Sequence, residues 1–237
     1  MQAQRMTQSA TDKLIVALDF PRYDDARHLV DDLGDAVTFY KVGLELLFHD
    51  GLALASEIKN DGKRVFLDMK FLDIGNTVEK AVAAVADLGF DFLTIHGTDS
   101  KTMKAAVKGR GNARLKLLAV TVLTSLDQAD LADQGIVMTP QELVLKRARL
   151  AHEAGIDGVI ASGQEAAAIR AATAHNFLIV TPGIRLPGGE AGDQKRITTP
   201  EDALRAGADH LVVGRPITAA SDPRRAAQTV LEHIARA

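Results

Sequence analysis

Three charged residues stand close together in the segment Asp68-Met69-Lys70-Phe71-Leu72-Asp73, directly after the apolar run at 64–67. Because strand side chains alternate, Asp68 and Lys70 would point to the same face if the strand continues that far. Lys41 ends the preceding apolar run, so it would lie on the neighbouring strand. Alternating carboxylates and ammonium groups can keep one another charged where water is excluded. The cluster predicts either electrostatic catalysis or an ion-pair network that only closes the fold, and the cost of burying several charges favours catalysis.

A second group of residues could bind a phosphate. Gly183 and Arg185 follow the apolar run 178–181, and Gly214 and Arg215 follow the run 210–213. Glycine lets backbone N–H groups approach phosphate oxygens closely, and arginine can make a bidentate, charge-assisted contact. Either turn alone would suit an ordinary chain reversal. Both together, in consecutive loops, indicate a phosphorylated ligand.

These residues need a scaffold that brings them to one place, and the chain has a regular alternation that would do so. Short apolar runs at 14–18, 37–42, 64–67, 92–96, 115–122, 158–161, 178–181 and 210–213 suit strands that are covered on both faces. Helical patterns lie between them, and two should begin after Thr139 and Thr199, because a proline follows each. The alternation predicts a single-domain α/β fold, a (β/α)8 TIM barrel, with its chemistry at the carboxyl ends of the strands. A doubly wound open sheet is the alternative, but no GxGxxG follows the first run.

Length and composition limit the possible functions. The chain has 237 residues, a net charge of −3 and no cysteine, which excludes disulfides and thiolate chemistry and gives no indication of nucleic-acid or membrane binding. No apolar run approaches the roughly 18 residues of a membrane span. Residues 1–12 are polar and are expected to form a flexible leader, with the catalytic domain at 13–237. A cytoplasmic location is expected.

Several motifs are similar to those of one known family. They are LIVALD at 14–19, YKVG at 40–43, DMKFLDIGNT at 68–77, TVLTS at 121–125, TPGIR at 181–185 and VVGRPI at 212–217. On these residues the chain resembles the orotidine 5′-monophosphate decarboxylases of the bacterial type, over nearly all of its length from Leu14. Many members carry proline where this chain has Gly75.

The resemblance implies a carboxy-lyase that makes UMP and CO2 in the last step of de novo pyrimidine synthesis. It implies that Lys70 protonates C6 of the pyrimidine and that Asp68 faces the departing carboxylate. It also implies that Lys41 and Asp73 complete an alternating array, and that Asp19 and Lys41 contact the ribose. No cofactor and no metal are expected.

The resemblance also implies a homodimer that binds a small-molecule nucleotide. Asp73, Ile74 and Thr77 would reach into the partner subunit's site. Thr124 and Ser125 would lie beside the base, and the phosphate end would be held by Arg185, Gln194, Gly214 and Arg215.

Three other functions stay open. Magnesium-dependent sugar-phosphate decarboxylases and aldolases share the D-x-K-x-x-D pattern, but they have an acid where this chain has Lys41, and a cation beside Mg²⁺ is electrostatically poor. A sugar-phosphate isomerase or epimerase could use Asp19 and Asp68 as an acid–base pair, which leaves the lysines without a role. A phosphate-ligand binding protein would not need Lys70.

Overall fold

Eight parallel strands close into a barrel in the computed structural model, which describes residues 9–188 and 196–237. Each strand pairs with the next one along the chain, and the last pairs with the first. The strands are β1 (Leu14–Ala17), β2 (Phe39–Gly43), β3 (Arg64–Phe71), β4 (Phe92–His96), β5 (Lys116–Val120), β6 (Gly158–Ile160), β7 (Leu178–Thr181) and β8 (His210–Val213). The predicted (β/α)8 barrel is confirmed, and each predicted apolar run overlaps one strand.

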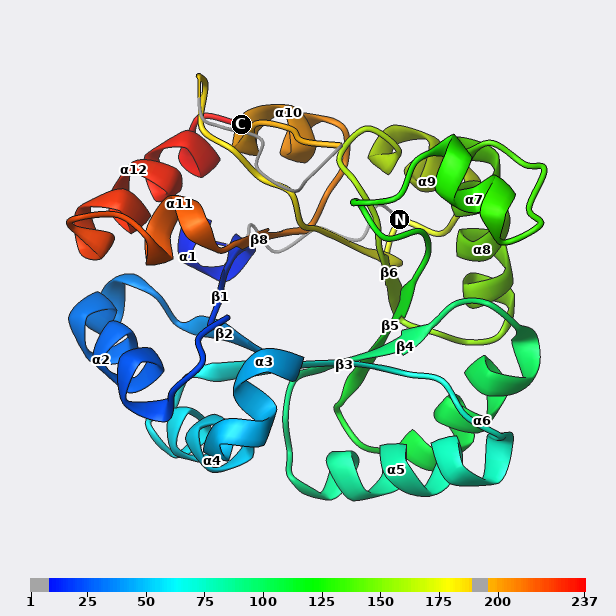
Figure 1. Cartoon of the computed structure of the whole chain (residues 1–237), viewed down its shortest axis with the longest axis horizontal. Helices are drawn as coiled ribbons and strands as arrows, with labels where there is room; N and C mark the ends of the chain where they lie inside the picture. Colours follow the sequence, from blue (N-terminus) through cyan, green and yellow to red (C-terminus); the bar gives the residue numbers. More distant parts are fainter. Residues whose placement is uncertain (1–8, 189–195) are drawn as a thin grey trace, which may run out of the picture.

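Most of the helices form an outer ring around the barrel (Figure 1). In chain order, the helices are α1 (Ala10–Lys13), α2 (Tyr23–Leu33), α3 (Leu44–Leu46), α4 (Leu52–Asn60), α5 (Gly75–Asp87), α6 (Ser100–Arg110), α7 (Gln128–Asp133), α8 (Pro140–Glu153), α9 (Ala166–Ala172), α10 (Pro200–Arg205), α11 (Arg215–Thr218) and α12 (Pro223–Ala235), with a 3-10 turn η1 (Gly34–Ala36) and a π-helical turn η2 (Leu47–Gly51). Thr139 and Thr199 cap α8 and α10 as predicted, each accepting a backbone N–H of the first turn. Within the described ranges no helix is long and apolar enough to cross a membrane.

Side chains inside the barrel change from apolar to charged along the strand direction. Phe39 and Phe66 belong to a buried inner cluster, and the ring of Phe92 packs edge-on against both at 5.0 and 5.9 Å. Inward positions repeat every two residues, so the next inward positions on β2 and β3 are Lys41 and Asp68. An aromatic floor therefore lies below the charged groups and keeps water from reaching them from the amino-terminal end.

Three aspartates fasten neighbouring strands at that amino-terminal end. Each follows a glycine by two residues, directly precedes an even-numbered strand, and accepts a backbone N–H from the odd-numbered strand before it. The bonds run from Val65 to Asp91 at 2.9 Å, from Leu117 to Asp157 at 3.0 Å and from Ile179 to Asp209 at 2.8 Å. A lysine or arginine also contacts each carboxylate. This repeated device stabilises the barrel at the end away from the candidate site.

The amino-terminal boundary differs from the expected one. Helix α1 begins at Ala10, inside the segment expected to be a flexible leader, while residues 1–8 lie outside the described part of the chain. Ser9 and Asp12 form a reciprocal capping box, and the Asp12 carbonyl accepts from Arg64 at 2.9 Å. His210 Nδ1 lies 2.9 Å from the same carbonyl. Residues 9–12 therefore cover the bottom of the barrel.

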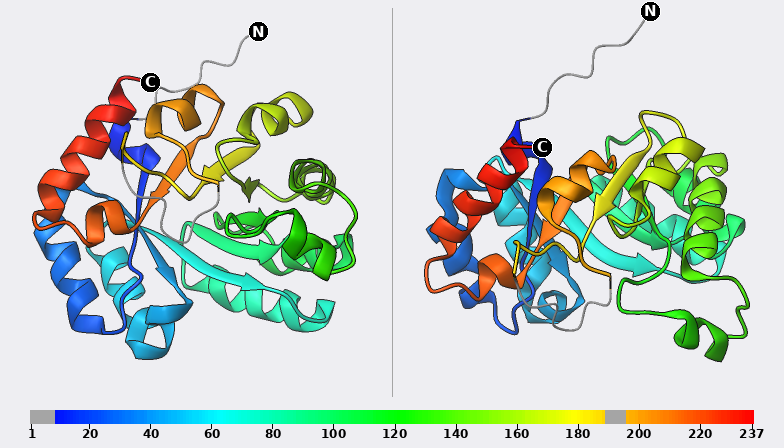
Figure 2. Two further views of the ribbon diagram at one scale, coloured as in Figure 1. Left: turned by 45° about the horizontal axis from the view of Figure 1, so that its top comes forward. Right: turned by 90° about the horizontal axis from the view of Figure 1, so that it is seen from above.

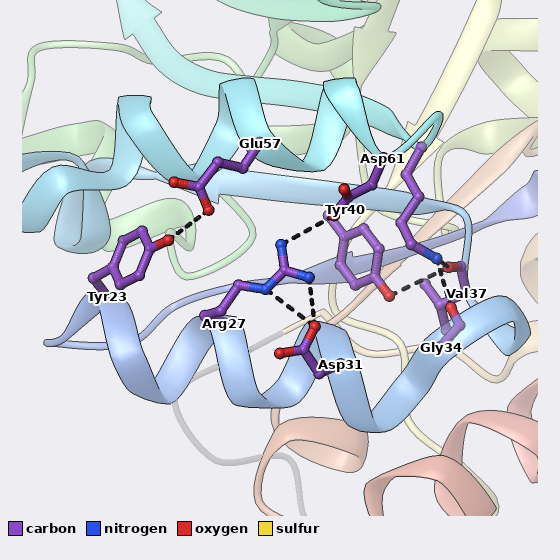
Figure 3. A network of polar contacts seen from close by, with 9 residues as sticks. Tyr23, Arg27, Asp31, Gly34, Val37, Tyr40, Glu57 and Asp61 are labelled. Carbon is purple, nitrogen blue, oxygen red and sulfur yellow. Dashed lines mark hydrogen bonds and ion pairs between the residues drawn. The ribbon is translucent and has the colours of Figure 1, made fainter.

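A polar network joins α2 to the neighbouring helix α4 (Figure 3), and Lys63, after α4, donates to the Gly34 and Val37 carbonyls in the turn before β2. Arg27 donates to Asp31 on its own helix and to Asp61, just after α4, at 3.0 Å. Tyr23 donates to Glu57 of α4. Since these groups are partly or fully exposed, each contact contributes little stability alone.

Candidate active site

The carboxyl ends of the strands surround one deep cavity of about 580 Å³. Its walls come from the segments after most of the strands, including the short helix α3 after β2 and α11 after β8. Figure 2 shows the segment that contains α7, after β5, projecting beyond the barrel. The predicted site residues that line this cavity are Asp19, Lys41, Asp68, Lys70, Thr124, Ser125, Arg185, Gly214 and Arg215. The structure thus brings nine residues from six different loops or strand ends to one space.

The charged cluster lies on one wall of the cavity and forms a continuous ion-pair chain. Lys70 Nζ lies 2.8 Å from Asp68 Oδ2, and Lys41 Nζ lies 3.5 Å from the same oxygen. Lys41 Nζ also donates to Asp19 Oδ1 at 2.8 Å. The carboxylate of Asp68 therefore stands between two ammonium groups. Strand β3 runs on to Phe71, and both Asp68 and Lys70 line the cavity, although the register of β3 shifts between Leu67 and Phe71.

Burial opposes the charged forms in this cluster, but the neighbouring charges outweigh it. Burial raises the pKa of the Asp68 carboxyl, yet the Lys41 and Lys70 ammonium groups and the hydrogen bonds from Lys70 and Thr94 bring that pKa below its ordinary value. Burial likewise lowers the pKa of Lys41, yet Asp68 and Asp19 bring it above its ordinary value. Both groups therefore stay ionised at neutral pH.

The opposite wall carries the residues predicted to bind phosphate. Gly183 and Arg185 follow β7, and Gly214 and Arg215 follow β8 where α11 begins. Gly183 has a φ of 74°, a left-handed conformation that favours glycine. Two guanidinium groups and two glycine turns thus face the same cavity as the Lys–Asp cluster. Gln194, predicted beside them, lies outside the described residues.

Three predicted residues do not reach this cavity. Asp73, Ile74 and Thr77 are exposed around the start of α5, and none lines the cavity of its own chain. The Asp73 carboxylate accepts the N–H of the next residue, Ile74, at 2.6 Å, just before α5 begins.

Two residues that sequence reasoning missed shape the cluster. Thr94 on β4 is fully buried, and its hydroxyl donates to Asp68 Oδ1 at 2.7 Å. A side chain on Gly43 would come within 2.9 Å of Lys41 Nζ and 3.2 Å of Asp19 Oδ1, so only glycine leaves the Lys41–Asp19 pair undisturbed. A single hydroxyl inside an apolar strand was the sequence signal for Thr94.

A buried ion pair connects two of the loops around the cavity. Arg196 donates to Glu165 at 2.6 Å and to the carbonyls of Val122 and Leu123 at 3.0 Å each. Both charged side chains are almost fully buried. The two carbonyls directly precede Thr124 and Ser125, so Arg196 ties the loop after β5 to the segment before α10. Sequence reasoning missed this pair as well.

Residues 9–188 and 196–237 contain no evident metal-binding site. No three histidine, aspartate or glutamate side chains in those ranges approach closely enough to hold a metal ion. Of the acids that line the cavity, Asp19 and Asp68 are each paired with lysine.

A closed parallel barrel with a charged cavity at the carboxyl ends of its strands defines an α/β-barrel protein of the kind that carries out catalysis at that face. The model of the family "Orotidine 5′-phosphate decarboxylase / HUMPS" matches residues 12–230. The chain is 54% identical over 228 residues to a protein of Nitrobacter winogradskyi named orotidine 5′-phosphate decarboxylase, covering 96% of this chain and 95% of that one. A protein of the same name from Caulobacter vibrioides is 53% identical over 231 residues, covering 96% and 99%.

Solved structures agree with these matches. The crystal structure of orotidine 5′-phosphate decarboxylase from Lactobacillus acidophilus superimposes with a TM-score of 0.81 at 37% identity, covering 93% of this chain and 98% of that chain. An uncharacterized conserved protein from Geobacillus kaustophilus gives a TM-score of 0.79 at 35% identity, covering 93% and 99%. The chain belongs to the orotidine 5′-phosphate decarboxylase / HUMPS family.

Proposed function

We propose that this protein decarboxylates orotidine 5′-monophosphate to UMP and CO2 without a cofactor. The observation that carries the proposal is the Asp68 carboxylate held between the Lys70 and Lys41 ammonium groups, at 2.8 and 3.5 Å, on the wall of a cavity that also presents Arg185 and Arg215. The names of the relatives agree with it, since proteins at 52–54% identity over nearly the whole chain are called orotidine 5′-phosphate decarboxylase.

The two walls of the cavity suit the two ends of a nucleotide. Arg185 and Arg215 supply charge-assisted donors for the phosphate, and Gly183 and Gly214 let the backbone approach its oxygens. The Asp19–Lys41 pair provides an acceptor and a donor for ribose hydroxyls. Thr124 and Ser125 provide hydroxyls for the polar edge of the base. Binding energy from the remote phosphate can thus hold the reacting carbon against Lys70.

The chemical step needs a cation and an acid at the same atom. When the bond between C6 and the carboxylate breaks, CO2 leaves and the electron pair stays on C6. The Lys70 ammonium stabilises that developing charge and then transfers its proton to C6, and solvent later restores the proton. Asp68 is ionised and would lie beside the substrate carboxylate, which disfavours the bound ground state.

The site is proposed to be completed by a second copy of the chain. Asp73, Ile74 and Thr77 are exposed and do not line the cavity of their own subunit. Leu72 and Ile74, which flank Asp73, have exposed fractions of 55% and 73%, and Phe48, in η2 after β2, has an exposed fraction of 82%. Exposed apolar groups of this size at one rim favour burial against another protein surface. In a homodimer, Asp73 of each subunit would extend the other's Lys–Asp array.

The magnesium-dependent sugar-phosphate reaction is the second candidate, because the family description includes a second group, HUMPS. Lys41 argues against it. Its ammonium lies 2.8 Å from Asp19 and 3.5 Å from Asp68, so a cation already occupies the space between the two acids. A divalent ion bound there would be repelled by Lys41 and Lys70.

The decisive experiment follows the absorbance loss of orotidine 5′-monophosphate with the purified protein, with and without a chelator. Turnover that the chelator leaves unchanged supports the proposal. Turnover that is lost with chelator and restored by Mg²⁺ contradicts it. Lys70→Ala distinguishes an enzyme from a protein that only binds the nucleotide. The variant should bind UMP with nearly wild-type affinity and lose decarboxylation. Equal turnover by the variant and the wild type would show that Lys70 takes no part in the chemical step.

A further inference from the structure

An irregularity in the sheet lies directly beside the charged cluster. Leu67 of β3 pairs with Leu93 of β4, and Phe71 pairs with Ile95, so the register shifts between these two pairs. Three residues of β3, Asp68 to Lys70, therefore stand opposite the single residue Thr94. A bulge of this kind breaks the regular ladder of hydrogen bonds and re-aims side chains, and bulges are common next to active sites.

The bulge forces an unusual backbone conformation on Lys70. Its φ is 50°, in the left-handed region that a residue with a β-carbon rarely adopts. Such a conformation costs on the order of 1–2 kcal/mol, so the surrounding contacts must hold it in place. The direction of the Lys70 side chain depends on this conformation.

Thr94 supplies the contact that the broken ladder lacks. Its hydroxyl accepts the backbone N–H of Lys70 at 3.0 Å and donates to Asp68 Oδ1 at 2.7 Å. The residue is fully buried, so water does not compete for either bond. One hydroxyl group thus binds the main chain of Lys70 and the side chain of Asp68 at once.

The second bond also decides which carboxylate oxygen meets the lysines. Because Thr94 occupies Oδ1 of Asp68, the other oxygen, Oδ2, faces Lys70 Nζ at 2.8 Å and Lys41 Nζ at 3.5 Å. Without the hydroxyl, the carboxylate could rotate, and the N–H of Lys70 would lose its acceptor. Both changes would move the Lys70 ammonium relative to the cavity.

We propose that Thr94 is a positioning residue for the reaction, in which its hydroxyl holds the backbone of Lys70 and the carboxylate of Asp68 in their working orientation. The inference rests on the proposed function. Thr94 does not line the cavity, so it acts through Lys70 and Asp68 and has no contact with the substrate.

The test compares Thr94→Val, which keeps the shape and removes the hydroxyl, with Thr94→Ser, which keeps the hydroxyl. Thr94→Val should lower kcat roughly 100-fold, because misplacing a catalytic group by about 1 Å has an effect of that size. Its KM and its affinity for UMP should change less than about threefold, since the contacts with the ligand remain. Thr94→Ser should recover most of kcat. Thr94→Ala is the second hydroxyl-free variant if the valine protein does not fold.

Thr121→Val provides the matched control. Thr121 is a buried threonine directly after β5, and its hydroxyl donates to the Ile160 carbonyl at 2.8 Å, away from the charged cluster. It should alter thermal stability and leave kcat within about threefold. The inference is overturned if Thr94→Val keeps wild-type kcat, or if the serine and valine variants lose kcat and UMP affinity equally.

Failure of the proposed function would look different. In that case the wild-type protein itself would not decarboxylate orotidine 5′-monophosphate. Amide hydrogen exchange would still test the hydrogen bond between the Lys70 N–H and the Thr94 hydroxyl. The Lys70 amide should exchange faster in Thr94→Val than in wild type, and it should exchange at the wild-type rate in Thr121→Val. Unchanged exchange at Lys70 in Thr94→Val would refute the contact that the inference needs.

Discussion

At the scale of single residues, the site depends on four charged side chains that lie within a small volume. Asp68 faces Lys70 and Lys41 from one oxygen, and Lys41 has Asp19 as a second partner. Two carboxylates and two ammonium groups therefore balance one another. Removing one member would leave a buried charge uncompensated, which is why each substitution here should affect its neighbours as well.

Gly43 offers the most direct test of this arrangement from outside the charged set. A β-carbon at this position would lie 2.9 Å from Lys41 Nζ, so Gly43→Ala should push the ammonium away from Asp19. Because Lys41 is a flexible side chain, the fold should tolerate the change. We expect kcat/KM to fall roughly 10- to 100-fold, since a small misplacement of a charged group is enough.

The measurement pairs steady-state kinetics with a thermal melt. The melting temperature of Gly43→Ala should stay near that of the wild type while kcat/KM falls. A large loss of stability with unchanged kcat/KM would mean that the Lys41 ammonium does not depend on the space beside Gly43.

Residue types and spacing were sufficient to predict much of this cluster. Asp68 and Lys70 could be predicted because both lie on the strand that carries them, and Lys41 because it ends the strand next to it. Thr94 and Gly43 could not, because their roles depend on pairing across strands and on empty space. Neither property is visible in a single run of residues.

At the scale of elements, strand and helix positions followed from the apolar runs, but the bulge in β3 did not. Its register shift depends on the contact of Lys70 with a hydroxyl on β4, which belongs to a different part of the sequence. The short helix α1 was missed for a similar reason. Ser9 and Asp12 cap it locally, and Arg64 and His210 hold it from distant strands.

The helices α5 and α6 provide an element-scale prediction because they pack very closely. A β-carbon on Gly109 of α6 would lie 2.2 Å from the Glu79 carbonyl oxygen on α5. Alanine would gain about 1 kcal/mol of helix propensity over glycine, but overpacking of this kind costs about 1–3 kcal/mol. Backbone atoms cannot move away as a flexible side chain can, so we expect Gly109→Ala to lower the free energy of unfolding.

Gly75→Ala is the matched control on the same helix pair. Its β-carbon would meet only the β-carbon of Ala105, at 3.5 Å, which is an ordinary contact. Urea denaturation should show this variant to be at least as stable as the wild type and Gly109→Ala to be less stable. Equal stability of the two alanine variants would contradict the close packing of α5 on α6.

At the scale of the whole molecule, barrel closure brings the first and last strands together. Strand β8 pairs with β1, so the residues proposed to bind phosphate, after β7 and β8, share a cavity with Asp19 after β1 and with Lys41 and Asp68 on β2 and β3. This proximity could be predicted only once eight strands were counted. Asp73 does not line the cavity of its own chain, so its proposed role can be tested only in the proposed dimer.

Subunit mixing tests that dimer. Lys70→Ala and Asp73→Asn should each be inactive alone, because each lacks one member of every site. After subunit exchange, about a quarter of the wild-type activity should return, since half the dimers are hybrids and each hybrid has one intact site. Mass spectrometry must verify that exchange occurred. Verified hybrids without recovered activity would contradict a shared site.

The bottom of the barrel determines how stability responds to acid. His210 is buried against Phe39 and Phe92, beside Arg64, and its Nδ1 lies 2.9 Å from the Asp12 carbonyl. Burial, with a smaller effect of Arg64, lowers the pKa of His210 from 6.5 to about 4. The folded state therefore holds His210 neutral at pH values where the unfolded chain is already protonated.

The direction in which stability changes with pH follows from the difference between the His210 pKa values of the folded and unfolded states. The unfolded state binds more protons between pH 6.5 and 4, so the stabilising contribution is present above pH 6.5 and is lost as the pH falls toward 4. Between pH 7 and 5 the loss should be about 2 kcal/mol. His210→Gln keeps a donor for the Asp12 carbonyl and does not titrate, so its unfolding free energy should fall less over the same interval. Denaturant unfolding at pH 7, 6 and 5 measures both proteins, and parallel pH profiles would mean that His210 is protonated equally in the folded and unfolded states.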